Sequence, residues 1–261
     1  MLKTTRKATP SPKASSPRMS LQETMRALKK AGSAQTRKTY ARHGAPEPMF
    51  GVKFGTLQLL WKRIRVDQDL AEALWKTGNF DARNLAVKVA DPATISSREL
   101  DRWAGTPTAW MCGGYIGTLT AEGPFGPAKA EKWISATDQP TRFTGWALVA
   151  ALALVDESLP DGWFTKRLKR IENSIAAATN QQRYAMNSAV IAIGCRNVAL
   201  RHLATAAARR IGTVDVDHGD TACKTPVAVE SIDKAWARSA SMGFVSPAAL
   251  DRARGSMRTR C

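Results

Sequence analysis

Cysteine is scarce in this 261-residue sequence, and its four cysteines are widely separated. They stand at Cys112, Cys195, Cys223 and Cys261, and no two of them form a C-x-x-C pair. Paired cysteines are typical of structural zinc sites and of redox motifs, so the sequence supports neither. Scattered cysteines indicate free thiols in a reducing compartment.

Long hydrophobic runs are also missing. The longest extends from Trp146 to Val155, about half the length that a membrane-spanning helix needs. The first twenty residues are basic but lack the apolar stretch of a secretory signal. We therefore expect no membrane partner and a cytoplasmic, nucleoid-associated protein.

Acidic residues are in deficit. There are 22 Asp and Glu residues against 39 Lys and Arg residues, which gives a formal charge of +17. Residues 1–43 alone contain 11 of the basic residues and one acid. Such a surplus indicates a polyanionic partner, with nucleic acid ahead of an anionic membrane. The sequence has no P-loop, dinucleotide fingerprint or nucleophile elbow, and we expect no cofactor.

The period-2 alternation of β-strands is nearly absent. Only Gly212–Val216 hints at it, and we interpret that stretch as a loop. Apolar residues at helical spacing instead predict an all-α chain of about a dozen helices with short loops. A compact bundle and a solenoid of stacked helix pairs both fit. Trp103, Trp133 and Trp163 are 30 residues apart, each expected near a helix start, and this spacing favours stacked repeats.

Three segments are expected along the chain. Residues 1–19 are rich in Ser, Thr, Pro and Lys and predict a disordered basic tail, either holding phosphates or simply solvated. Ser20 and Glu23 have the spacing of a capping box, which begins the first helix of a repeat domain over residues 20–245. Residues 246–261 are expected to be a basic C-terminal tail with a helix over 247–257.

Short motifs along residues 38–240 resemble the DNA alkylation repair family of alkylpurine DNA glycosylases built from HEAT-like repeats. The motifs follow the family's order: Tyr40-Ala41-Arg42-His43-Gly44, Met49-Phe50-Gly51, Leu74-Trp75, Gly78-Asn79, Asp81-Ala82-Arg83, Ala90-Asp91-Pro92, Ala185-Met186-Asn187, Ala192-Ile193-Gly194, Arg196-Asn197, Val216-Asp217-His218-Gly219 and Cys223-Lys224-Thr225-Pro226. The resemblance implies a curved α-solenoid, monomeric, whose basic concave face holds double-stranded DNA.

The resemblance also implies a chemistry. Members of the family that are glycosylases excise cationic 3-methyladenine and 7-methylguanine without a metal, using a carboxylate that stabilises the developing positive charge on the sugar. The family's aromatic residue falls on Trp110, but the carboxylate position four residues later is Gly114. A second tryptophan position falls near Ser188, and an expected arginine falls on Phe143. Glycosylase activity therefore stays an open alternative.

Asp81 is the substitute catalytic acid that the motifs offer, and its alternative role is a helix N-cap. The residues expected to bind DNA share a place in or beside the family motifs: Trp110, Arg83, Arg142, Arg183, Arg196 and Lys224. Trp110 could equally belong to the core, and each cation alone could be a solvated or helix-capping side chain.

A cluster near the C-terminus invites a zinc interpretation. His218 and Cys223 lie among Asp215, Asp217 and Asp220, but no second ligand pair accompanies them. We favour a loop that braces the last helices and expect no metal. Cys223 has no histidine partner fixed by the sequence and is not expected to be a nucleophile.

Three functions compete. The first is binding of damaged duplex DNA, with or without excision of alkylated purines. The second is non-catalytic binding of branched or distorted DNA. The third is a helical-repeat scaffold for proteins, which steep salt dependence of DNA binding would contradict.

Overall fold

The computed structural model describes residues 19–108 and 110–260, and the side chain of Trp110 lies outside this description. Apart from one isolated bridge between Gly32 and Val52, the regular structure in the described part is helical, which confirms the all-α prediction. The helices in chain order are α1 (Leu21–Ala31), α2 (Ala34–Arg42), α3 (Phe54–Ile64), α4 (Gln68–Lys76), α5 (Phe80–Val89), α6 (Ser97–Ala104), α7 (Trp110–Ala121), α8 (Gly126–Ile134), α9 (Gln139–Val155), α10 (Asp161–Ser174), η1 (Ile175–Ala177), α11 (Asn180–Gly194), α12 (Val198–Ile211), α13 (Ala228–Ser241), α14 (Pro247–Ala253) and η2 (Met257–Thr259).

Helix starts follow from side chains that accept the free amides of the first turn. The capping box predicted at Ser20 and Glu23 is present, with reciprocal hydrogen bonds of 3.2 and 2.8 Å. The same kind of cap, a side-chain oxygen accepting the amide three residues later, occurs at Ser33, Asp67, Asn79, Ser96, Asp138, Asn197 and Ser246. These helix starts are therefore encoded locally, whereas α3, α8, α10, α11 and α13 begin without a side-chain cap.

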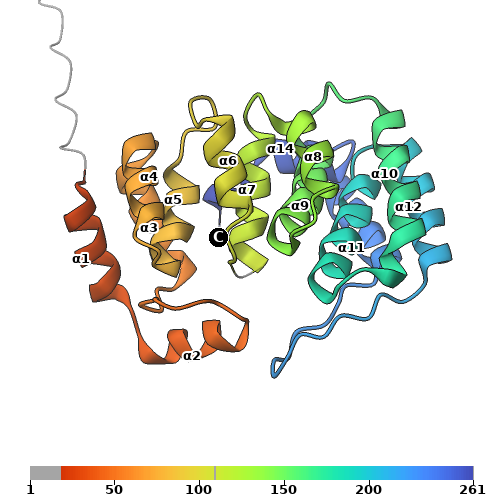
Figure 1. The fold of residues 1–261 in the computed structure, drawn as a ribbon. Coiled ribbons are helices and arrows are strands. Elements are labelled where there is room, and N and C mark those ends of the chain that lie inside the picture. The colour runs from red at the N-terminus through yellow and green to blue at the C-terminus, as the bar shows by residue number, and fades with distance from the viewer. Residues whose placement is uncertain (1–18, 109, 261) are drawn as a thin grey trace, which may run out of the picture.

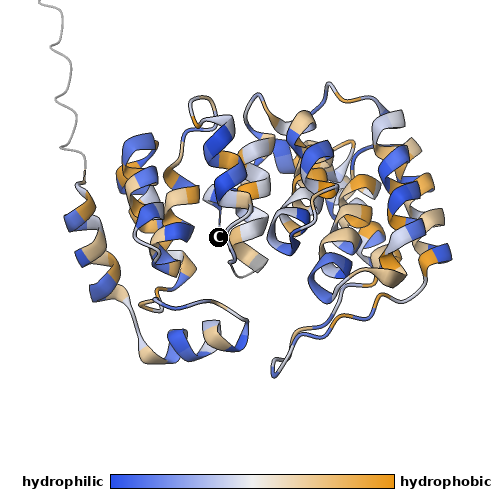
Figure 2. Cartoon of the chain, viewed as in Figure 1, coloured by the Kyte–Doolittle hydropathy of each residue, from blue (hydrophilic) through white to orange (hydrophobic). Residues whose placement is uncertain are grey.

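The helices form two layers of a curved solenoid (Figure 1). Successive inner helices α3, α5, α7, α9, α11 and α13 each contact the next, and α4, α6, α8, α10 and α12 lie outside them. Figure 2 shows hydrophobic and hydrophilic residues alternating along most helices, as amphipathic packing requires. No described helix combines the length and apolarity needed to span a membrane.

One tryptophan stands on each of four successive outer helices. Trp75 in α4 stacks on Trp103 in α6, with ring centroids 4.3 Å apart, and Trp133 and Trp163 follow in α8 and α10. The 30-residue spacing therefore does mark successive repeats. The expected position was wrong for Trp103 and Trp133, which lie in the last turn of their helices rather than the first.

The prediction of a C-terminal tail is wrong for the described residues. Helix α14 packs against α9 and α13 and buries Ala248 and Leu250. Beyond it, Arg258 is only 4% exposed, and its Nε lies 2.7 Å from the Glu122 carboxylate. The basic composition of residues 246–261 indicated a tail, but the acidic partner of Arg258 lies far away in the sequence, at the end of α7. The predicted N-terminal tail lies outside the described residues except for Met19.

Candidate functional site

A groove of about 970 Å³ lies on the inner layer of the solenoid. Residues of α3, α5, α7, α9 and α11 line it, and the end of α2 and the loop between α12 and α13 contribute its mouth. Its residues come from points far apart in the sequence, from Thr39 to Met257. The stacking of the inner helices therefore creates a continuous binding surface.

Small residues form the floor of the groove. Gly114 in α7, Ala147 and Ala150 in α9, and Ser188 in α11 all line it. A Cβ atom added to Gly114 would meet nothing within 4 Å, so this residue faces open space. Gly117, three residues later, packs closely against α9, because a Cβ there would lie 2.8 Å from the amide nitrogen of Leu148. Glycine thus brings α7 against α9 at one position and opens the groove at another.

Aromatic rings wall one end of the groove. Tyr40 lies 5.6 Å from Phe54 and 5.5 Å from Phe80, measured between ring centroids, and Phe54 lies 6.3 Å from Tyr115. The Tyr40 hydroxyl donates a 2.7 Å hydrogen bond to the carbonyl of Val52. These contacts join α2, α3, α5 and α7 into one apolar wall.

At the other end, Tyr184 of α11 meets His218 edge to face, with centroids 6.0 Å apart. Burial raises the pKa of the Tyr184 hydroxyl. His218 belongs to the loop between α12 and α13, which Asn180 holds through two hydrogen bonds to the backbone of Asp217, of 2.6 and 2.7 Å. Asn187 donates a further bond of 2.8 Å to the carbonyl of Pro226. Residues 212–216 form a loop, as predicted, and these bonds fix the part of the loop that follows, at Asp217 and Pro226.

The mouth of the groove carries exposed polar residues. Arg42 and His43 at the end of α2 and Lys224 on the loop line it. The two sides approach one another, since a Cβ on Gly219 would lie 3.8 Å from the carbonyl oxygen of Arg42. Among the described lining residues, Asp217 is the sole carboxylate, and its Oδ1 accepts the amide of Gly219. The described floor therefore has no carboxylate.

Asp81 does not face this groove. It is fully buried, and its carboxylate accepts the amides of Phe50, Gly51 and Val52 at 2.6, 3.1 and 2.8 Å. The alternative role is also wrong, because Asn79 is the N-cap of α5. Asp81 fixes the Met49-Phe50-Gly51 segment, which explains why these two motifs occur together. Its burial and its three hydrogen bonds to backbone amides do not support the proposed catalytic role.

The four arginines expected to hold phosphates do not line the groove. Arg196 is buried along α9, where its guanidinium donates to the carbonyls of Ala153 and Leu159 at 3.2 and 2.8 Å. Arg83 lies over the ring of Trp75, and burial lowers the pKa of its guanidinium. Arg142 and Arg183 are half-buried, and each donates to a backbone carbonyl of its own neighbourhood. Their positions indicate structural roles at helix ends.

Lys224 is the expected DNA-binding cation that the structure does place at the groove. Trp110 begins α7, but its side chain lies outside the described residues. Sequence reasoning missed Arg42 and Tyr184 as lining residues. Arg42 stood within a quoted motif, whereas nothing in the sequence separated Tyr184 from the core aromatics.

The two buried thiols offer little further chemistry. Burial raises the pKa of Cys112 and of Cys195 to about 12, so neither is a ready nucleophile. Over the residues that the structure covers, no group of three or more His, Cys, Asp or Glu side chains is arranged to hold a metal ion.

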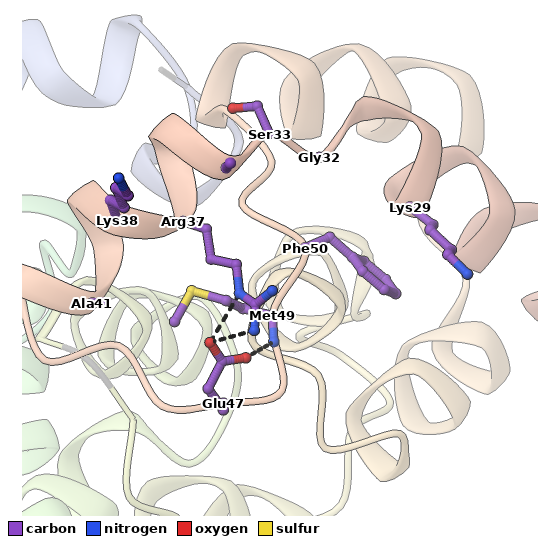
Figure 3. Close-up of a pocket in the computed structure, with 10 residues that line it drawn as sticks. Lys29, Gly32, Ser33, Arg37, Lys38, Ala41, Glu47, Met49 and Phe50 are labelled. Carbon is purple, nitrogen blue, oxygen red and sulfur yellow. Dashed lines mark hydrogen bonds and ion pairs between the residues drawn. The ribbon is translucent and has the colours of Figure 1, made fainter.

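A second, shallower pocket of about 540 Å³ lies between α1, α2 and the segment after α2. Figure 3 shows the side chain of Arg37 directed at Glu47, with 2.9 Å between its Nη2 and the Glu47 carboxylate. The hydrogen bonds from Arg37 and from the amide of Met49 lower the pKa of Glu47. This exposed ion pair already engages Arg37, and the pocket is smaller and more open than the groove, which makes the larger groove the stronger candidate.

Comparison with known proteins agrees with the architecture. A family model described as DNA alkylation repair enzyme matches residues 23–218. Uncharacterized proteins of Listeria monocytogenes and Listeria innocua are 27% and 26% identical over 206 residues, covering 77% of this chain and 90% of each relative.

A solved structure comes from a new family of proteins related to the HEAT-like repeat DNA glycosylases with affinity for branched DNA structures. It is 28% identical, with a TM-score of 0.76, and the match covers 87% of this chain and 96% of that one. The match confirms the prediction of a HEAT-like solenoid.

Proposed function

Because this chain belongs to the DNA alkylation repair enzyme family, we propose that it binds branched or distorted DNA at the groove and excises no base there. The groove combines exposed cations at its mouth with a described floor that lacks a carboxylate. Without a carboxylate on the floor, the positive charge that develops during base loss on a sugar bound there is not stabilised. That composition is the observation on which the proposal depends.

A branch is favoured as the ligand for two reasons. The similar solved protein belongs to a family with affinity for branched DNA structures. In addition, the approach of Gly219 to Arg42 narrows the mouth, which disfavours entry of a straight duplex. Phosphate contacts from the mouth and the basic exterior supply sequence-independent affinity.

Binding is tested with a four-way junction, a three-way junction and a linear duplex of matched length, each titrated at several salt concentrations. We expect tighter binding to the junctions, with affinity for every DNA falling steeply as salt rises. Equal affinity for junctions and duplex would contradict the branch preference. Binding that is weak and insensitive to salt would instead favour a protein scaffold.

The role of the mouth is tested by combining Arg42→Glu with Lys224→Glu. The control combines Arg209→Glu with Lys169→Glu, which change exposed cations on the outer helices α12 and α10. We expect the mouth variant to lose about tenfold or more in junction affinity and the control to lose less. Equal losses would show that net charge alone matters.

Excision is tested by incubating the wild type with alkylated duplex DNA and measuring released 3-methyladenine and 7-methylguanine. We expect no release above that of a buffer control. Release by the wild type would overturn the non-catalytic assignment and leave the binding proposal standing.

A further inference from the structure

We propose that the groove floor is a binding site for one or two unstacked nucleobases at the unpaired point of a DNA branch. This inference deepens the proposed function and depends on it. It gives a role to the apolar interior of the groove, which phosphate binding does not explain.

The shape of the floor fits a planar ring. Gly114, Ala147, Ala150 and Ser188 leave open space on α7, α9 and α11. The half-buried Tyr115 and Tyr184 border this space. Proteins that bind unpaired nucleotides stack the bases on aromatic side chains, which is possible for every base because each has a π-face. The floor therefore offers a slot with an aromatic residue at each end.

The distribution of charge fits a nucleotide rather than a wholly apolar ligand. Phe54, Phe80 and Phe143 line the interior together with the alanines, while Arg42 and Lys224 stand at the mouth. A nucleotide has the same polarity, with a planar base at one end and an anionic phosphate at the other. The base can be buried while its phosphate stays with the cations.

The size of the groove also selects the ligand. Pockets for small molecules have volumes of about 300–1,000 Å³, and a groove of about 970 Å³ reaches the top of that range. A volume of this size matches one or two nucleotides. The close approach of Gly219 to Arg42 admits a single strand more readily than a duplex.

The polar groups of the floor predict little base preference. Thr118 and Ser188 donate their hydroxyl hydrogens to carbonyls of their own helices, at 3.2 and 2.9 Å. With these donors engaged, the floor offers few groups to read a base edge. We expect stacking to dominate and the four bases to bind with similar affinity.

The test fills the slot without disturbing the fold. Gly114→Leu places a bulky side chain where an added Cβ meets nothing within 4 Å. Gly162→Leu is the matched control, because Gly162 also lies in a helix, α10, with open space around its Cβ and no part in the groove. The DNA is a junction with two unpaired nucleotides at its branch point, one of them the fluorescent base 2-aminopurine. A linear duplex serves as the reference.

For the wild type and for Gly162→Leu, we expect the fluorescence of the branch-point base to fall on binding, as stacking quenches it. For Gly114→Leu we expect no such fall, about tenfold weaker binding to the junction, and unchanged binding to the duplex. If the fluorescence falls as much with Gly114→Leu as with the wild type, the proposal of a nucleobase site on the floor is overturned. If the wild type itself binds the junction no more tightly than the duplex, the proposed function is refuted.

A second pair of variants examines the aromatic border. Tyr184→Phe keeps the ring, and we expect it to retain the quenching and the junction affinity. Tyr184→Leu removes the ring and is expected to lose both while keeping its circular dichroism spectrum. Equal behaviour of the two variants in a folded protein would overturn the role of stacking.

Discussion

At the scale of single residues, two glycines of one helix have opposite surroundings. Gly114 faces the groove, whereas a Cβ on Gly117 would be 2.8 Å from the backbone of Leu148. We expect Gly114→Ala to stabilise the fold by about 0.5–1 kcal/mol, because alanine is the better helix former. Gly117→Ala is expected to cost about 1–3 kcal/mol by pushing α7 from α9. Urea denaturation of both variants checks the signs, and equal effects would refute the assigned faces.

Asp81 is also a residue whose place decides its role. Its carboxylate accepts three backbone amides in a buried site. Asp81→Asn removes the charge and turns one acceptor into a donor, so we expect a loss of about 2–4 kcal/mol in the free energy of unfolding. DNA affinity per folded molecule should not change. A fully stable variant with altered DNA binding would contradict the structural assignment.

At the scale of secondary-structure elements, Asp101 fastens α6 to α8. Its carboxylate receives hydrogen bonds from Lys132 and from the indole of Trp133, each of 2.8 Å, and lies 2.7 Å from the ammonium of Lys129. Burial opposes ionisation of Asp101, but the bonds from these three residues outweigh it and lower the pKa of the carboxyl. The interaction therefore belongs to the ionised form.

A carboxyl whose pKa is lowered by folding stabilises the protein above its unfolded pKa of about 3.9. That stability is lost as the pH falls through the lower folded value. We expect Asp101→Asn to reduce the free energy of unfolding by about 1–2 kcal/mol at pH 7. The difference from the wild type should shrink steadily below pH 4. A difference that is constant down to pH 2 would show that charge is not the cause.

At the scale of the whole molecule, what the sequence predicted depends on how local each signal is. Helix starts such as Ser20 follow from neighbouring residues, and the solenoid followed from motifs in their family order. The role of Arg196 could not be predicted from the sequence. A cation that caps a distant helix end and a cation that binds phosphate look alike in sequence. The docking of Arg258 on Glu122 likewise joins residues 136 positions apart.

The charge of the chain yields a last prediction at the same scale. Residues 1–18 contain five Lys and Arg residues and no acid. If this segment contacts phosphates, deleting it should weaken binding to junctions and duplexes alike. Each lost contact should reduce the slope of log affinity against log salt by about 0.9. The preference for junctions should survive, because the groove that we assign to the branch lies within residues 39–257. Titrations of both DNAs at several salt concentrations measure the affinities and the salt slopes. If the deletion abolishes the preference for junctions and leaves duplex affinity unchanged, the N-terminal segment and not the groove recognises the branch.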